Sequence, residues 1–171
     1  MRHHVRILGL TLSLLLVPAF ATAGGQDARV SATLDGKAVS VEDAAAPGNH
    51  CLIVADTDLR CFAKQRDRDA LADDLASRVS AELTASSLYT IAYVDANYGG
   101  GSLGIASDVA NLHAFGFGDK ITSLESATNK KPVWHQHTGY GGLNWSWGRG
   151  ANVANVGSTA NDQFSSVEAN S

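Results

Sequence analysis

The sequence lacks an apolar run long enough to cross a membrane. Its longest run, residues 7–20, is shorter than the roughly 20 residues that a spanning helix requires. The run follows the basic residues Arg2 and Arg6 and ends before Ala21-Thr22-Ala23, which has the small-x-small form of a signal-peptidase site. We therefore predict a signal peptide over residues 1–23, a secreted, extracellular protein and no membrane anchor.

Cysteine is scarce, because Cys51 and Cys61 are the only two in 171 residues. Their spacing fits neither C-x-x-C nor a zinc knuckle, which disfavours a redox pair or a metal pair. In an oxidising compartment, one disulfide between them is the expected state.

Basic charge is also scarce. Removing residues 1–23 takes two of the 13 basic residues and none of the 17 acidic residues, which leaves a net charge of −6. An acidic chain with scattered basic residues argues against a nucleic-acid partner, because the phosphates would repel it. The same charge favours cations.

Signatures of enzyme catalysis are missing as well. The sequence contains no G-x-S-x-G, no H-E-x-x-H and no candidate catalytic cysteine. Gly99, Gly101 and Gly104 match the dinucleotide pattern G-x-G-x-x-G by letter, but no helix pattern follows them. We therefore predict that the protein is not an enzyme.

Residues 24–87 are predicted to form two hairpins and a helix. Alternating apolar residues flank the turn signal Asp35-Gly36 and predict one hairpin that continues to Val41. The stretches around Cys51 and Cys61 predict a second hairpin. Apolar residues at every fourth position then predict an amphipathic helix over residues 66–83 that covers one face of a small sheet.

Residues 88–171 contain an internal repeat. Tyr98-Gly99-Gly100 recurs 42 residues later as Tyr140-Gly141-Gly142, and residues 119–124 align with residues 162–167. Each copy, residues 88–128 and residues 129–171, has the apolar alternation of short strands and is too small to bury a face alone. Two copies packed face to face predict a β-sandwich. The expected fold class is mainly β, with a small disulfide-stapled α+β region before the sandwich.

Three residues of the first copy resemble the corner of the βγ-crystallin Greek key. That corner has an aromatic residue, four residues, a second aromatic, one residue and glycine, which Tyr93, Tyr98 and Gly100 match. Glycine allows a backbone conformation that a side chain would forbid, and the two aromatic rings stack. In the second copy Tyr140 and Gly142 match, but His135 replaces the first aromatic, which predicts a weaker or differently packed corner.

Both copies also resemble the calcium sequence of the microbial βγ-crystallins: Asn/Asp, Asn/Asp, two free positions, Ser/Thr, Ser. Residues 161–166 match at every position, and residues 118–123 match at all but the first, Gly118. The resemblance implies one or two Ca²⁺ ions, which prefer oxygen ligands. The implied ligands, exchanged between the copies, are Asp119, Thr122, Asn161, Asp162 and Ser165. Ser123 and Ser166 are implied to brace the loops, and bracing without any bound ion is the alternative.

The whole layout resembles one secreted bacterial branch of this superfamily, related to a small metalloproteinase inhibitor of crystallin fold. That resemblance implies an inhibitor of an extracellular (metallo)peptidase. Inhibition is not visible in the residues themselves. The alternative is a calcium-stabilised structural or surface-binding module without a peptidase target.

Two further sets of side chains have alternative interpretations. His135 and His137 would share one side of a strand and could hold zinc with a third ligand, but surface histidines are the favoured interpretation. The tryptophans Trp134, Trp145 and Trp147 would form either an exposed aromatic platform or part of the core, and packing in the core is favoured.

Overall fold

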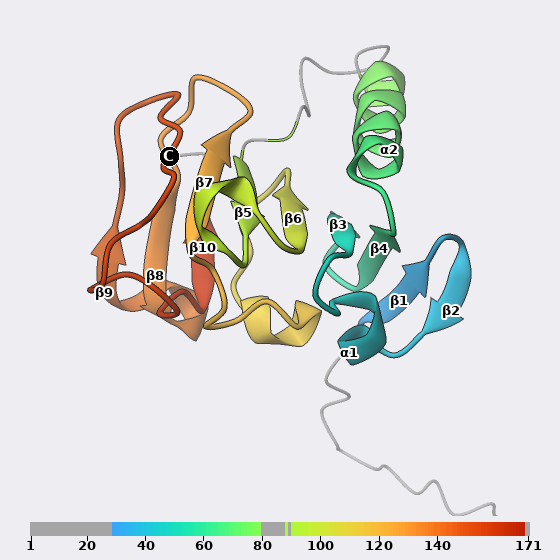
Figure 1. Cartoon of the computed structure of the whole chain (residues 1–171), viewed down its shortest axis with the longest axis horizontal. Helices are drawn as coiled ribbons and strands as arrows, with labels where there is room; N and C mark the ends of the chain where they lie inside the picture. The colour runs from blue at the N-terminus through green and yellow to red at the C-terminus, as the bar shows by residue number, and fades with distance from the viewer. Residues whose placement is uncertain (1–28, 80–87, 89, 170–171) are drawn as a thin grey trace, which may run out of the picture.

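The computed structural model describes residues 29–79, 88 and 90–169, which form two β-sheets (Figure 1). The N-terminal region of the chain contains β1 (Ser31–Leu34), β2 (Lys37–Val39), α1 (Val41–Ala44), β3 (His50–Ala55), β4 (Asp58–Phe62) and α2 (Gln65–Val79). The first copy of the repeat contains β5 (Thr90–Tyr93), η1 (Ala96–Tyr98), β6 (Ser102–Ile105), η2 (Leu112–Phe115) and β7 (Ser123–Ser126). The second copy contains β8 (Val133–His137), η3 (Thr138–Tyr140), β9 (Gly141–Trp145) and β10 (Ser166–Glu168).

One sheet has seven strands in the order β2-β1-β4-β3-β6-β5-β7, and the other has three strands in the order β10-β8-β9. Each copy forms a β-bridge with a strand of the other copy. Val109 of the first copy bridges Val167 of β10, and Val153 of the second copy bridges Leu124 of β7. Each copy therefore completes the sheet of the other, as expected for units too small to bury a face alone.

One hydrophobic cluster of the described residues contains side chains of both sheets and of the N-terminal region. Trp134 is buried and packs on the Phe164 ring at a centroid distance of 5.2 Å. Trp145 and Trp147 are half-buried and contact the same ring edge-on. These contacts favour packing in the core over an exposed aromatic platform.

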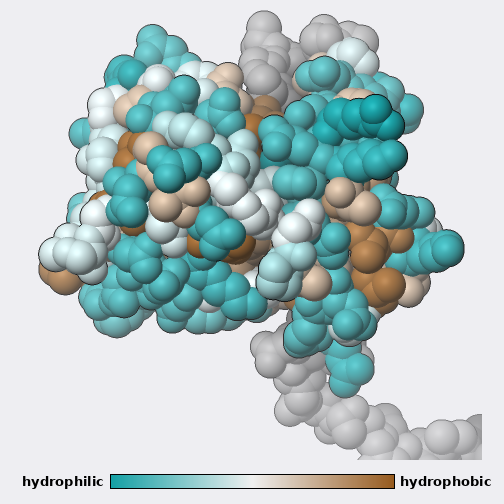
Figure 2. Space-filling model, viewed as in Figure 1, coloured by the Kyte–Doolittle hydropathy of each residue, from teal (hydrophilic) through white to brown (hydrophobic). Residues whose placement is uncertain are grey.

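The N-terminal region begins with a hairpin whose turn residues have positive φ, 48° at Asp35 and 79° at Gly36. The expectation that this hairpin continues to Val41 is wrong. Ser40 accepts a hydrogen bond from the Asp43 amide and caps α1, so the chain turns into a helix there. The face seen in Figure 2 is largely hydrophilic, and hydrophobic surface shows near β1 and β2.

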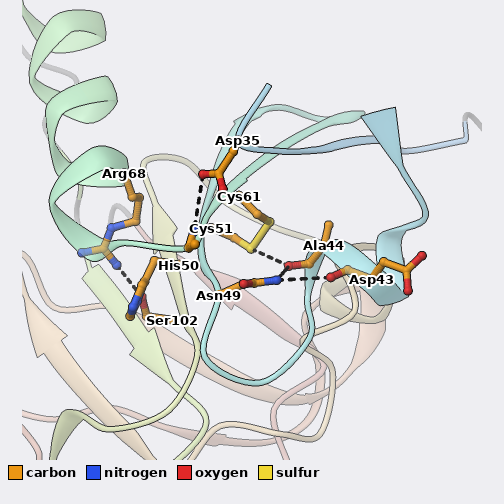
Figure 3. Close-up of a disulfide and its surroundings, with 10 residues drawn as sticks. Asp35, Asp43, Ala44, Asn49, His50, Cys51, Cys61, Arg68 and Ser102 are labelled. Carbon is orange, nitrogen blue, oxygen red and sulfur yellow. Dashed lines mark hydrogen bonds between the residues drawn. A yellow bond between two sulfur atoms is a disulfide. The ribbon is translucent and has the colours of Figure 1, made fainter. Parts of the chain in front are cut away.

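A disulfide joins Cys51 on β3 to Cys61 on β4, which are direct partners across the second hairpin (Figure 3). The predicted disulfide is confirmed, and both cysteines are buried. Helix α2 follows and packs against β3 and β4. The predicted end of the helix, residue 83, and the predicted signal peptide lie outside the described residues.

The N-terminal region joins the repeat through parallel pairing of β3 with β6. Arg68 of α2 is completely buried at this junction, where its Nη1 donates to Ser102 Oγ at 2.7 Å. His50 Nδ1 lies 2.9 Å from the same oxygen (Figure 3). Burial, together with the nearby Arg68 charge, lowers the pKa of His50. Because the two regions share one sheet, the boundary between residues 87 and 88 stays a prediction.

These features confirm the predicted fold class, mainly β with a paired-copy sandwich after a small disulfide-stapled α+β region. No helix in the described ranges 29–79 and 90–169 is long and apolar enough to span a membrane.

Candidate metal centre

Two aspartates that the calcium motif singles out occupy equivalent turns. Asp119 has φ 54° and Asp162 has φ 55°, a left-handed conformation that aspartate tolerates better than most residues. The amide of Asp119 donates to the Phe164 carbonyl at 3.0 Å, and the amide of Asp162 donates to the Ile121 carbonyl at 3.3 Å. The turn of the first copy is therefore bonded to the residue before Ser165. The turn of the second copy is bonded to the residue before Thr122.

In the turn of the first copy, a carboxylate and a hydroxyl from different copies are in contact. Ser165 Oγ donates to Asp119 Oδ1 at 3.1 Å. A histidine that the sequence analysis did not select completes the group, because His113 Nε2 lies 3.0 Å from Ser165 Oγ and 3.7 Å from Asp119 Oδ2. The structure thus brings together two of the predicted ligands and adds a nitrogen donor.

In the turn of the second copy, Asn161 Nδ2 donates to Asp162 Oδ2 at 2.7 Å. The Asp162 amide donates to the carbonyl of Ile121, which directly precedes Thr122, so the backbone at Thr122 lies next to this turn. The side chains of Asn161, Asp162 and Thr122 can all offer oxygen. The two turns therefore differ in chemistry although their backbones are equivalent.

Asp119 and Asp162 line a common hollow of about 280 Å³. Ala45 and Pro47 of the N-terminal region form part of its wall, and Lys120 lies at its side with its amine donating to the Gly116 carbonyl. Within the described part of the chain, no three His, Cys, Asp or Glu side chains converge on one point. A cation here would use carboxylate, amide and hydroxyl oxygens with carbonyls and water, a donor set that suits Ca²⁺.

The motif serines hold the neighbouring corners. Ser123 Oγ accepts from the Tyr98 amide at 3.0 Å and donates to the Asp95 carbonyl at 2.6 Å. Ser166 Oγ makes the same pair of bonds, with the Tyr140 amide at 3.0 Å and the His137 carbonyl at 2.6 Å. These bonds tie each folded corner to the last strand of its own copy.

The corner glycines leave no room for a side chain. Gly100 has φ 71°, and a Cβ there would lie 2.5 Å from the Asp95 carboxylate. Gly142 has φ 77°, and a Cβ there would lie 2.7 Å from the His137 ring. Both positions combine a left-handed backbone with close approach of a neighbour, which only glycine satisfies without strain.

The aromatic corners of the two copies have matching geometry despite different residues. The rings of Tyr93 and Tyr98 meet edge-on at 5.8 Å and 71°, and those of His135 and Tyr140 meet edge-on at 5.9 Å and 69°. Burial and the hydrogen bond to Glu125 raise the pKa of Tyr93 to about 12. The histidine therefore takes the place of the aromatic without changing how the corner is built.

The interpretation of His135 as a surface histidine is wrong. Its exposed fraction is 6%, and its Nε2 lies 2.9 Å from Glu168 Oε2. His137 is exposed, and the register of β8 shifts between the two histidines. Because of this shift, the regular alternation of β8 is interrupted, and the rings of His135 and His137 do not share the same environment.

No protein-family model matches the chain, and no curated protein sequence matches it. Solved structures that resemble it include a βγ-crystallin domain from Clostridium beijerinckii, 25% identical over 47% of this chain and 94% of that one, with a TM-score of 0.42. A βγ-crystallin from Ciona intestinalis is 25% identical over 46% of this chain and 95% of that one, with a TM-score of 0.42. A βγ-crystallin from an archaeon is 26% identical over 46% and 93%, with a TM-score of 0.42. The structure neighbours are thus βγ-crystallin domains.

Proposed function

We propose that this is a secreted calcium-binding protein whose ion stabilises the contact between the two copies of the repeat. The proposal assigns calcium to Asn161, Asp162 and Thr122. A second ion at Asp119 and Ser165 would have one side-chain oxygen fewer, because Gly118 has no side chain. The observation that carries the proposal is the reciprocal backbone pairing of the two aspartate turns, in which the Asp162 amide bonds to the carbonyl before Thr122 and the Asp119 amide to the carbonyl before Ser165.

Calcium bound there would neutralise carboxylates that face a shared hollow and would join segments from both copies. An ion that binds only the folded state stabilises it by about 2.7 kcal/mol at a hundredfold excess over its dissociation constant. We therefore expect millimolar calcium to raise the melting temperature above that measured in chelator.

The decisive variant is Asp162→Gly, because glycine keeps the left-handed backbone and removes the carboxylate. Asp35 offers a matched control, since it also has a positive φ but lies in the β1–β2 turn. The calcium-dependent rise in melting temperature should disappear in Asp162→Gly and persist in Asp35→Gly. Equal rises in both variants would count against this site.

Inhibition of an extracellular peptidase is a second candidate function, and it rests on the resemblance alone. An inhibitor of this kind needs a protruding segment, so it matters whether the loops of residues 108–117 and residues 152–160 project as a narrow wedge or lie flat. Both loops are held to the body of the protein: Val109 and Val153 bridge to strands, and Leu112, Phe115 and Phe117 are buried. This arrangement favours the alternative, a calcium-stabilised structural or surface-binding module.

Titration of a thermolysin-like metallopeptidase and a subtilisin-like serine peptidase with the protein, at fixed calcium, separates the two functions. Stoichiometric loss of activity at micromolar protein supports an inhibitor. Full activity of both peptidases, together with a calcium-dependent melting temperature, supports the structural or surface-binding module.

A further inference from the structure

The turn of the first copy holds three donor atoms that come from separate segments of the chain. His113 lies in η2, Asp119 lies in the turn before β7, and Ser165 comes just before β10. The donors are separated by 3.0 Å (His113 Nε2 to Ser165 Oγ), 3.1 Å (Ser165 Oγ to Asp119 Oδ1) and 3.7 Å (His113 Nε2 to Asp119 Oδ2). The side chains of His113 and Asp119 are 46% and 49% exposed, so an ion can reach them from solvent.

Local structure holds the imidazole in place. Asn111 Oδ1 accepts hydrogen bonds from the amides of His113 and Ala114 and so caps η2. The Leu112 amide donates to the Ser165 carbonyl at 2.8 Å, which fastens η2 to the segment that carries the hydroxyl. Backbone bonds therefore hold the two segments that carry His113 and Ser165 against each other.

Gly118 makes room for this ring. A Cβ at position 118 would lie 2.3 Å from the His113 imidazole, so a side chain at position 118 and this position of His113 exclude each other. Gly118 is also the only position at which the first calcium motif departs from its pattern. The absence of a side chain at position 118 is therefore what allows the His113 ring to occupy this place.

The second copy has the opposite arrangement. Asn155 Oδ1 accepts from the Gly157 amide, as Asn111 Oδ1 accepts from the His113 amide, so Gly157 is the equivalent of His113. Asn161 is the equivalent of Gly118 in the motif. One turn thus has an imidazole and no amide side chain, and the other has an amide side chain and no imidazole.

We propose that His113, Asp119 and Ser165 form a mixed nitrogen and oxygen site for a borderline divalent transition-metal ion such as Zn²⁺. Ligands at ~2.1 Å from a tetrahedral ion are about 3.4 Å apart, a spacing that lies within the range of the three donor separations. Imidazole suits zinc and its neighbours, whereas calcium takes oxygen ligands. A water molecule would take the fourth position of a tetrahedral ion, because the protein supplies three donors.

The calcium proposal assigns its ion to Asn161, Asp162 and Thr122, and this inference adds His113 to Asp119 and Ser165, which only a second calcium ion would share. The two proposals can therefore fail separately. The test uses the full chain without an affinity tag, in a background where His3 and His4 are alanine so that they do not compete for metal. Calorimetric titrations with zinc chloride and with calcium chloride measure the two affinities. Long-range ¹H–¹⁵N spectra of the histidine rings identify the ring that binds zinc.

We expect one zinc ion to bind and the His113 Nε2 resonance to shift. His113→Ala should weaken zinc binding by at least about tenfold, since even changes behind a metal ligand have effects of that size. His113→Gln retains much of the side-chain volume and serves as a second variant if alanine disturbs η2. The matched control is His137→Ala, which removes an exposed histidine and should leave the zinc affinity unchanged.

Asp119→Gly should weaken zinc binding in the same way, and Asp162→Gly should leave it intact while removing calcium binding. Zinc affinity that is unchanged in folded His113→Ala and His113→Gln would overturn the proposal. A zinc-dependent shift of His135 or His137 in place of His113 would overturn it as well.

Discussion

The imidazole of His135 lies 2.9 Å from the carboxylate of Glu168. Tyr93 makes the equivalent contact in the first copy, where its hydroxyl donates to Glu125 at 2.7 Å. Glu125 is the third residue of β7, and Glu168 is the third residue of β10. Each of these strands is the last one described in its copy. The second corner therefore keeps a ring bonded to a glutamate, although the ring belongs to a different residue type.

A double-mutant cycle with His135→Ala and Glu168→Gln should show a coupling of about 0.5–1.5 kcal/mol in the free energy of unfolding, the usual net value of such a bond. Tyr93→Phe and Glu125→Gln form the matched cycle in the first copy and should couple with the same sign. Urea denaturation measures both. Additive effects at His135 and Glu168 would mean that their contact does not stabilise the fold.

Loss of either motif serine should destabilise the protein. Ser123→Ala and Ser166→Ala each leave an amide and a carbonyl without their partner at a fully buried hydroxyl, which costs about 1–3 kcal/mol. Ser146→Ala is the control, because Ser146 is exposed and such changes stay within about 0.5 kcal/mol. Urea denaturation with chelator present separates this bracing role from any effect of a bound ion. Stability equal to the control would argue against bracing.

Removal of the disulfide should also lower stability. The bond closes a short loop with a sequence separation of 10, for which the restricted entropy of the unfolded chain predicts about 2–3 kcal/mol. The double variant Cys51→Ala and Cys61→Ala, compared with the oxidised protein by urea denaturation, tests this value. The same variant should retain calcium-dependent stabilisation, because the disulfide lies outside the aspartate turns.

Alkaline pH should weaken the fold through Tyr93. Its pKa is about 12 in the folded protein, against 10.0 for an ordinary tyrosine, so the unfolded chain loses this proton first. The contribution is present in full below pH 10 and is lost as the pH rises toward 12. Denaturation midpoints measured between pH 8 and pH 11 should fall less steeply in Tyr93→Phe. An ultraviolet titration in which every tyrosine ionises near pH 10 would contradict the assignment.

Local patterns predicted much of this structure. The repeated Tyr-Gly-Gly marked both corners because a left-handed glycine beside an aromatic ring is a local requirement, seen at Gly100 and Gly142. The turn at Asp35 and Gly36 was visible for the same reason. The prediction for Val41 failed because the alternation of apolar residues did not take into account the helix cap that Ser40 supplies.

Other features depend on tertiary contacts that no single stretch of sequence reveals. His113 reaches Ser165 across 52 positions, and its selection requires knowing that Gly118 leaves space beneath the ring. One signal was available for Glu168, since extending the alignment of residues 119–124 and 162–167 by one position pairs it with Glu125. The parallel pairing of β3 with β6 had no comparable signal, because parallel partners lie far apart in the chain.

That pairing also governs how the molecule behaves toward copies of itself. Without β3, strand β6 would end its sheet and present a row of unpaired amides and carbonyls, a template for edge-to-edge aggregation. The N-terminal region covers that row with a strand from the same chain, and buried Arg68 fastens it to β6 through Ser102. Proteolytic loss of this region is therefore expected to expose the edge of β6 and to promote aggregation of the sandwich that follows it.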